Sequence, residues 1–237
     1  MGTPPPPGWH PDPFGRAALR YWDGGRWTEH VSTGGATAVD PPPEPDRAIL
    51  TGAALVFEYD SPQTGDGWFV WDDRAQLLAR VTGSTGFQGL GAMRYRMVDP
   101  KGLPLMVVEE GGPTRPGLHV LDPFGRPLGV VRGWGTNERS HYDLVAGATA
   151  VGAVDLAATR YTIDATLTDA AGHQVAALTK GVEPLDTFRH RSWFALTRDP
   201  ELADPLRSLV VAAPLAVHMD LFRRSIGDRG HDRWDPL

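Results

Sequence analysis

Several features that mark secreted proteins and many enzymes are missing from this sequence. None of the 237 residues is a cysteine, which excludes disulfide frameworks, thiolate zinc sites and cysteine nucleophiles. The opening residues Met1–Pro4 show neither the basic region nor the apolar region of a signal peptide. We therefore expect a cytoplasmic chain whose folding depends on packing alone.

An excess of basic charge is also missing. The formal net charge is −6 at pH 7, whereas an extended nucleic-acid surface needs a clustered excess of lysine and arginine. The apolar run Leu209–Val217 falls well short of the ~20 residues that cross a bilayer, and it contains Pro214. Neither a nucleic-acid partner nor a membrane-spanning helix is expected.

Motifs for catalysis and metal binding are absent as well. The eight histidines show no His-x-His or His-Glu-x-x-His spacing, and the chain has no Gly-x-Ser-x-Gly elbow or P-loop. Gly86–Gly91 is glycine-rich but lies between predicted strands, which favours a hairpin loop. His218 and Asp220 do not share a helix face, so His218 is interpreted as a hydrogen-bonded helix residue. We expect no enzymatic activity, catalytic residue, metal ion or cofactor.

What the chain does contain begins with an aromatic, turn-rich segment, residues 1–31. Asp23-Gly24-Gly25 predicts the tight turn of a β-hairpin, because these residues adopt the positive φ that such turns require. A module this small has little area to bury, so Trp9, Trp22 and Trp27 are expected to form most of its core. Residues 32–46, which are rich in glycine and proline, predict a semi-rigid linker.

From residue 47 onward, one sequence pattern recurs. It consists of an apolar run, an aspartate-centred turn with glycine three residues later, and another apolar run. It occurs in Met97–Leu105, Val120–Leu128 and Leu167–Val175, with Trp71–Leu77 as a degenerate copy. This pattern predicts successive β-hairpins. About a dozen strands follow, too many for a flat open sheet, so a closed antiparallel barrel is the simplest fold.

A barrel of that width needs something to fill it. Residues 204–224 predict a helix, with Asp204 as N-cap, Pro205 at the first position and two arginines at the end. Its run Leu209–Val217 is apolar on every side, which is typical of a fully buried helix. The prediction is therefore a mainly β domain over residues 47–224, a closed barrel of about twelve strands around a buried C-terminal helix. A small Trp-rich hairpin module precedes this domain, and a polar tail, residues 225–237, follows it.

Two stretches of the barrel domain resemble a known superfamily. Leu118–Val131 resembles the hairpin V-x-D-P-x-G-x-x-x-G-x-V of tubby-like C-terminal proteins. Ala203–Phe222 resembles their closing helix. That superfamily includes phospholipid scramblases and LURP-one-related proteins. The resemblance implies a non-enzymatic protein associated with phospholipid or membrane surfaces. Scramblases carry an acidic calcium segment and palmitoylated cysteines; Thr187–Phe194 is instead basic and aromatic, so calcium-triggered scrambling is not implied.

Residues Gly8–Val31 resemble a second family, the Trp-rich domain DUF2510, through the pattern GW-x-x-DP-x-G followed by RYWDG-x-x-WT. The domain is common in actinobacterial proteins, often beside membrane segments, and has no assigned chemistry.

Two sets of residues are candidates for binding. Arg189, Arg191, Arg223 and Arg224 could contact anionic lipid headgroups, each contributing ~1 kcal/mol near a charged surface; solvated charge with helix capping is the alternative. This hypothesis places the protein in the cytoplasm, peripherally at the inner face of the plasma membrane.

Trp9, Trp22 and Trp27 are the second set. They could form a cradle for a proline-rich or membrane protein partner, which would make the chain a scaffold; a minimal aromatic core is the alternative.

Overall fold

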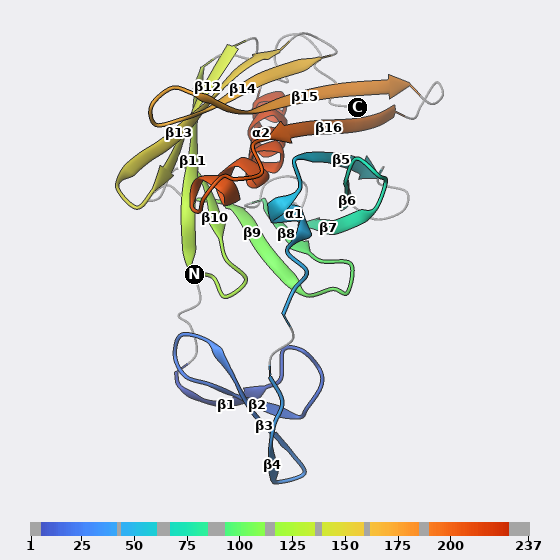
Figure 1. Ribbon diagram of the computed structural model, residues 1–237, viewed down its shortest axis with the longest axis vertical. Coiled ribbons are helices and arrows are strands. Elements are labelled where there is room, and N and C mark those ends of the chain that lie inside the picture. Colours follow the sequence, from blue (N-terminus) through green and yellow to red (C-terminus); the bar gives the residue numbers. More distant parts are fainter. Residues whose placement is uncertain are drawn as a thin grey trace. The chain divides into compact units, whose positions relative to one another are not determined.

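The computed structural model describes residues 6–41, 44–60, 67–84, 93–111, 117–135, 139–158, 162–184 and 190–227. The chain divides into two compact units, residues 1–45 and 46–237, which are treated separately below (Figure 1).

The first unit is a four-stranded antiparallel sheet in the order β1-β2-β3-β4. Its strands are β1 (Gly8–Pro11), β2 (Leu19–Trp22), β3 (Trp27–Thr33) and β4 (Ala36–Val39). The predicted hairpin turn connects β2 to β3, where the Asp23 carboxylate accepts hydrogen bonds from the backbone N–H of Gly25 at 2.8 Å and Arg26 at 2.7 Å.

The segment predicted as a linker, residues 32–46, contributes to this sheet. Gly34 and Gly35 have φ values of 60° and 85°, the conformation that a tight hairpin turn requires. This turn allows β4 to pair with β3 from His30 to Thr33. Gly34 and Gly35, which were predicted to lie in a semi-rigid linker, therefore form a turn, and the four-stranded sheet extends beyond Val31.

The second unit is a closed barrel of twelve antiparallel strands, as predicted (Figure 1). Each strand pairs with its neighbours in sequence, and β16 pairs with β5 to close the barrel. The strands are β5 (Ala54–Asp60), β6 (Gly67–Trp71), β7 (Leu77–Ser84), β8 (Arg94–Val98), β9 (Pro104–Glu110), β10 (Leu118–Leu121), β11 (Pro127–Gly135), β12 (Arg139–Ala146), β13 (Thr149–Ala158), β14 (Ile163–Asp169), β15 (Gln174–Pro184) and β16 (His190–Arg198).

The aspartate-centred turns connect these strands as the sequence predicts. At Asp122 the carboxylate accepts the N–H of Phe124 and of Arg126, both at 2.9 Å. Gly125 adopts φ 83°, and its N–H reaches the Asp122 carbonyl at 3.0 Å. The turns at Asp99 and Asp169 repeat this geometry. In the degenerate copy Ala75 takes the glycine position with φ 58°.

Helix α2 (Leu206–Gly227) fills the barrel (Figure 1, red). Every residue from Ser208 to Val217 is buried, which confirms the prediction of a helix buried on all sides. The helix starts two residues later than predicted. Asp204 lies ahead of it, and its carboxylate accepts a hydrogen bond from Ser208 Oγ at 2.7 Å. The short helix α1 (Ala48–Thr51) adds the buried side chain of Ile49 to the same core.

Two glycines in the barrel wall make room for α2. A Cβ added at Gly129 would lie 2.6 Å from the Val145 carbonyl oxygen and 2.8 Å from Leu209 Cδ2. At Gly152 it would lie 2.3 Å from the Thr168 carbonyl oxygen and 3.0 Å from Leu206 Cδ1. Strands and helix therefore approach each other more closely than a side chain would allow.

Within the described ranges, neither helix combines the length and the apolar character needed to span a membrane.

Candidate functional site

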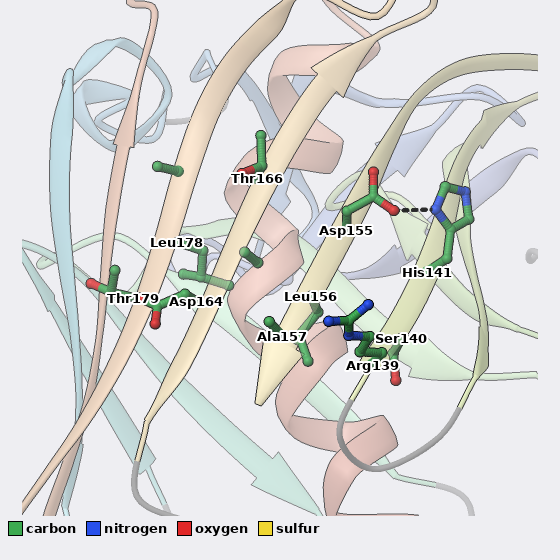
Figure 2. Close-up of a pocket in the computed structure, with 12 residues that line it drawn as sticks. Arg139, Ser140, His141, Asp155, Leu156, Ala157, Asp164, Thr166, Leu178 and Thr179 are labelled. Atoms are coloured by element: carbon green, nitrogen blue, oxygen red, sulfur yellow. Dashed lines mark hydrogen bonds and ion pairs between the residues drawn. The ribbon is translucent and has the colours of Figure 1, made fainter. Parts of the chain in front are cut away.

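The candidate site is a groove on the outer face of the barrel, across β12 to β15, with a volume of about 620 Å³ (Figure 2). In these strands alternate residues are buried inside the barrel, and the residues between them face outward. The outward-facing residues that line the groove are Arg139, His141, Asp155, Ala157, Asp164, Thr166, Ala177 and Thr179.

Strand register arranges these residues in two parallel rows. One row crosses the strands as Arg139, Ala157, Asp164 and Thr179. The neighbouring row runs His141, Asp155, Thr166 and Ala177. Ala157 and Ala177 carry only a methyl group, so the outer surface is depressed at these two positions. Longer side chains of the groove surround each depression.

His141 and Asp155 form the tightest pair in the groove (Figure 2). His141 Nδ1 lies 2.6 Å from Asp155 Oδ1, and His141 Nε2 lies 3.4 Å from Asp143 Oδ1. The hydrogen bond with Asp155 raises the pKa of His141, and Asp143 adds to the effect. The imidazole thus lies between two carboxylates, and both favour its protonated form.

Thr166 and Thr179 place their hydroxyl groups on the outward face of the groove. Ser140 neighbours His141 in sequence, but it faces the barrel interior and is buried. The outward face of the groove therefore offers a ligand charged side chains and threonine hydroxyl groups. In the described residues no group of three or more histidine, aspartate or glutamate side chains could hold a metal ion.

None of the groove residues was a candidate from the sequence. Apolar and polar residues alternate in Ile163–Leu167, and the apolar residues Ile163, Ala165 and Leu167 are buried inside the barrel. Which outward residues meet across four strands depends on register, which that alternation does not specify.

The three candidate tryptophans do not form a single cluster. Trp22 is 5% exposed and packs on Trp27, with ring centroids 5.2 Å apart. Trp9 is 41% exposed and meets the edge of Tyr21 at 5.5 Å. Trp22 and Trp27 thus belong to the core of the unit, whereas Trp9 lies at its surface.

The core of this unit also contains a charged residue that the sequence did not indicate. Arg20 is fully buried, and its guanidinium donates to Asp12 Oδ1 at 2.8 Å and to Asp40 Oδ2 at 2.7 Å. It also donates to the Thr28 carbonyl at 3.0 Å. A motif signal was present, since Asp12 and Arg20 both lie in the Trp-rich pattern, but Asp40 lies in the segment interpreted as a linker.

The candidate lipid-binding arginines lie where the structure describes little. Arg189 is outside the described residues. Arg191 lies on β16, and Arg223 and Arg224 lie on α2, but their side chains are outside the described part of the chain. Gly86–Gly91 is outside it as well.

His218 lies within an aromatic cluster at the barrel interior. Its ring centroid is 4.9 Å from that of Trp68, 5.8 Å from that of Tyr59 and 6.2 Å from that of Tyr95. Desolvation lowers the pKa of His218 to about 3, with repulsion from Lys180 as a second cause. The imidazole is therefore neutral at physiological pH.

A comparison with protein families identifies the N-terminal unit. Residues 7–46 match the family model DUF2510, described as a protein of unknown function. This match spans the whole four-stranded sheet. No curated protein matches the sequence. Among solved structures, an X-ray structure of a protein from Arabidopsis thaliana is similar, with 11% sequence identity and a TM-score of 0.41. That similarity covers 74% of this chain and 96% of the Arabidopsis chain.

Proposed function

We propose that this chain is a non-enzymatic, scramblase-related (tubby-like) protein that associates peripherally with phospholipid at the inner face of the plasma membrane. Calcium-triggered scrambling is not part of the proposal. The single observation that carries it is a closed twelve-stranded barrel around a helix whose apolar segment Leu209–Val217 is buried, the architecture that the resemblance to this superfamily implies.

Because α2 fills the barrel, we expect binding to involve the outer surface. Helix α2 is buried from Ser208 to Val217, so its apolar side chains pack against strands. Arg223 and Arg224 follow this stretch in the final turns of the same helix. An arginine near an anionic surface contributes ~1 kcal/mol of binding energy, so two neighbouring arginines would contribute measurably.

Co-sedimentation with liposomes tests the proposal. We expect the protein to pellet with phosphatidylcholine vesicles containing phosphatidylglycerol at low salt and to stay in the supernatant with phosphatidylcholine alone. Salt should release it, because screening weakens surface electrostatics. The double variant Arg223→Glu, Arg224→Glu should lose most of the binding.

The matched control is the double variant Arg80→Glu, Arg96→Glu, since both residues are exposed on β7 and β8 and the change in net charge is the same. It should retain binding. Equal recovery of the parent protein in the supernatant with and without anionic lipid would refute the proposal.

A second candidate function is a scaffold that binds a proline-rich or membrane protein through the N-terminal unit. The observation in its favour is Trp9, which is 41% exposed beside Tyr21. Exposed aromatic side chains of this kind line the grooves that bind polyproline segments.

A pull-down from lysate with the full chain tests this candidate. Trp9→Ala removes the exposed indole without touching the buried Trp22, and it should remove specific partners. Thr37→Ala, at an exposed position on β4, serves as the control. An identical set of partners for the parent protein and Trp9→Ala would count against the scaffold.

A further inference from the structure

Three charged side chains surround one small residue in the outer groove. Ala157 is directly opposite Arg139 on β12 and opposite Asp164 on β14. Asp155 precedes Ala157 by two residues on the same face of β13. Figure 2 shows the Arg139 side chain directed toward Ala157. The methyl group of Ala157 is thus the floor of a cradle, with Arg139 on β12 at one side, Asp164 on β14 at the other, and Asp155 two residues away on β13.

The two carboxylates are spaced to share a cation. Asp155 pairs with Thr166, and Asp164 is two residues before Thr166, so the carboxylates are diagonal neighbours. Diagonal neighbours in an antiparallel pair lie about 7–8 Å apart, too far for their carboxylates to touch but close enough for both to reach one ammonium group. Among the described residues, neither Asp164 nor Asp155 Oδ2 has a hydrogen bond or ion pair.

We infer that this cradle binds a small zwitterion with a primary ammonium group and an anionic group on a short spacer, such as phosphoethanolamine. The ammonium sits over Ala157 between Asp155 and Asp164, and the anionic group lies against Arg139. The guanidinium of arginine suits phosphate and carboxylate because its donors form a fixed fork.

The carboxylates set the specificity for a primary amine. A primary ammonium has three N–H donors, so it can bond to both aspartates and to the hydroxyl of Thr166 or Thr179. A trimethylammonium group has no donor and is usually bound by the faces of Trp, Tyr or Phe rings, and none of these three residue types lines the groove in the described part of the chain. The cradle should therefore distinguish phosphoethanolamine from phosphocholine.

The soluble zwitterion site goes beyond the proposed function, whereas its use for a lipid headgroup rests on that function. Two experiments distinguish a soluble zwitterion from a lipid headgroup as the ligand. The soluble arm titrates phosphoethanolamine into the full chain and follows backbone amide shifts of β12 to β15 by NMR. The lipid arm compares co-sedimentation with vesicles of phosphatidylcholine alone and vesicles that also contain phosphatidylethanolamine. The anionic-liposome test above contains no ethanolamine lipid, so the two failures are distinguishable.

We expect saturable shifts with phosphoethanolamine, and much weaker ones with phosphocholine, inorganic phosphate or ethanolamine. Asp164→Asn should weaken binding about tenfold, the usual effect of losing a charge-assisted hydrogen bond. Ala157→Leu should abolish binding by filling the cradle, with an unchanged unfolding transition because the position is exposed. Asp73→Asn, at an exposed turn, changes the net charge equally and should have no effect.

Equal shifts with phosphocholine, no shift with phosphoethanolamine, or unchanged affinity in Asp164→Asn would each overturn the inference. Soluble binding without a gain on ethanolamine vesicles supports the zwitterion site and rejects the lipid source.

Discussion

At the scale of single residues, the charged groups of this protein are placed where their environment strongly affects them. Arg20 is fully buried and holds together a part of the sheet that has little apolar area. A buried ion pair contributes little compared with an apolar replacement, but removing one partner leaves an uncompensated charge. The main contribution of Arg20 to stability is therefore that it compensates the charges of Asp12 and Asp40.

Arg20→Met should unfold the N-terminal unit. Loss of one partner of a buried charge pair costs about 3–5 kcal/mol, more than a sheet of this size can tolerate. The measurement is the dispersion of the Trp22 and Trp27 indole N–H signals in an NMR spectrum of the full chain. The control Arg26→Met alters a side chain that is 77% exposed and should leave these signals in place. Retained dispersion in Arg20→Met would show that the buried charge is dispensable.

His141 should make the barrel more stable in acid than its Gln variant. The hydrogen bond with Asp155 raises the folded-state pKa of His141 above the unfolded value of about 6.5. Its stabilising contribution is therefore fully present below about pH 6.5 and is lost as pH rises through the folded pKa. His141→Gln should lower the free energy of unfolding at pH 5.5 by up to about 1 kcal/mol, because the pair is partly exposed.

Urea denaturation of both proteins at pH 5.5 and pH 9 measures this difference. His218 acts in the opposite direction, because its low folded pKa destabilises the native state as pH falls from about 6.5. That effect is common to both proteins and cancels in the comparison. A difference that is the same at both pH values would contradict the prediction.

At the scale of elements, the close packing of α2 against the barrel wall depends on glycine residues in the strands. Gly129 and Gly152 lie where Leu209 and Leu206 of the helix approach the strands. Native cores have few voids, so added atoms must displace their neighbours. Small residues in the wall are therefore as necessary as large residues on the helix.

Gly152→Val should destabilise the barrel by about 1–3 kcal/mol, the usual cost of overpacking a core. The added Cβ would lie 2.3 Å from the Thr168 carbonyl oxygen, and this backbone atom cannot move without disturbing the pairing of β13 and β14. Thermal unfolding monitored by near-UV circular dichroism provides the measurement. Ala150→Val on the exposed part of β13 adds a larger side chain without this clash and should have little effect. Equal transitions in both variants would argue against close packing at this position.

At the scale of the whole molecule, the barrel and α2 share one hydrophobic core. The hydrophobic core contains side chains from strands around the barrel and from the helix together. Neither part can bury its apolar surface alone, since a twelve-stranded barrel is too wide to be filled by its own side chains.

Val211→Asp should therefore unfold the whole barrel. Val211 is fully buried within the hydrophobic core, and placing a carboxylate among apolar side chains costs several kcal/mol. The near-UV signal and the dispersed amide signals of all twelve strands should disappear together, while those of the N-terminal sheet remain. Ala150→Asp, at an exposed position, is the control. Loss of only a few strands would show that the barrel does not depend on the helix.

The local features of this protein follow from its sequence. Aspartate and glycine at fixed spacing form the turns, alternation defines inner and outer faces, and an apolar run too short for a membrane forms the buried helix, because each depends on neighbouring residues. Strand number then favours closure of the barrel.

Only the tertiary structure decides which distant residues meet. Arg20 contacts Asp40 because β4 pairs with β3 and Asp40 directly follows β4. Arg139, Asp155 and Asp164 surround Ala157 because of the register of β12, β13 and β14. Register and burial depend on contacts far apart in the chain, so the groove on the outer face could not be predicted, whereas the helix inside the barrel could.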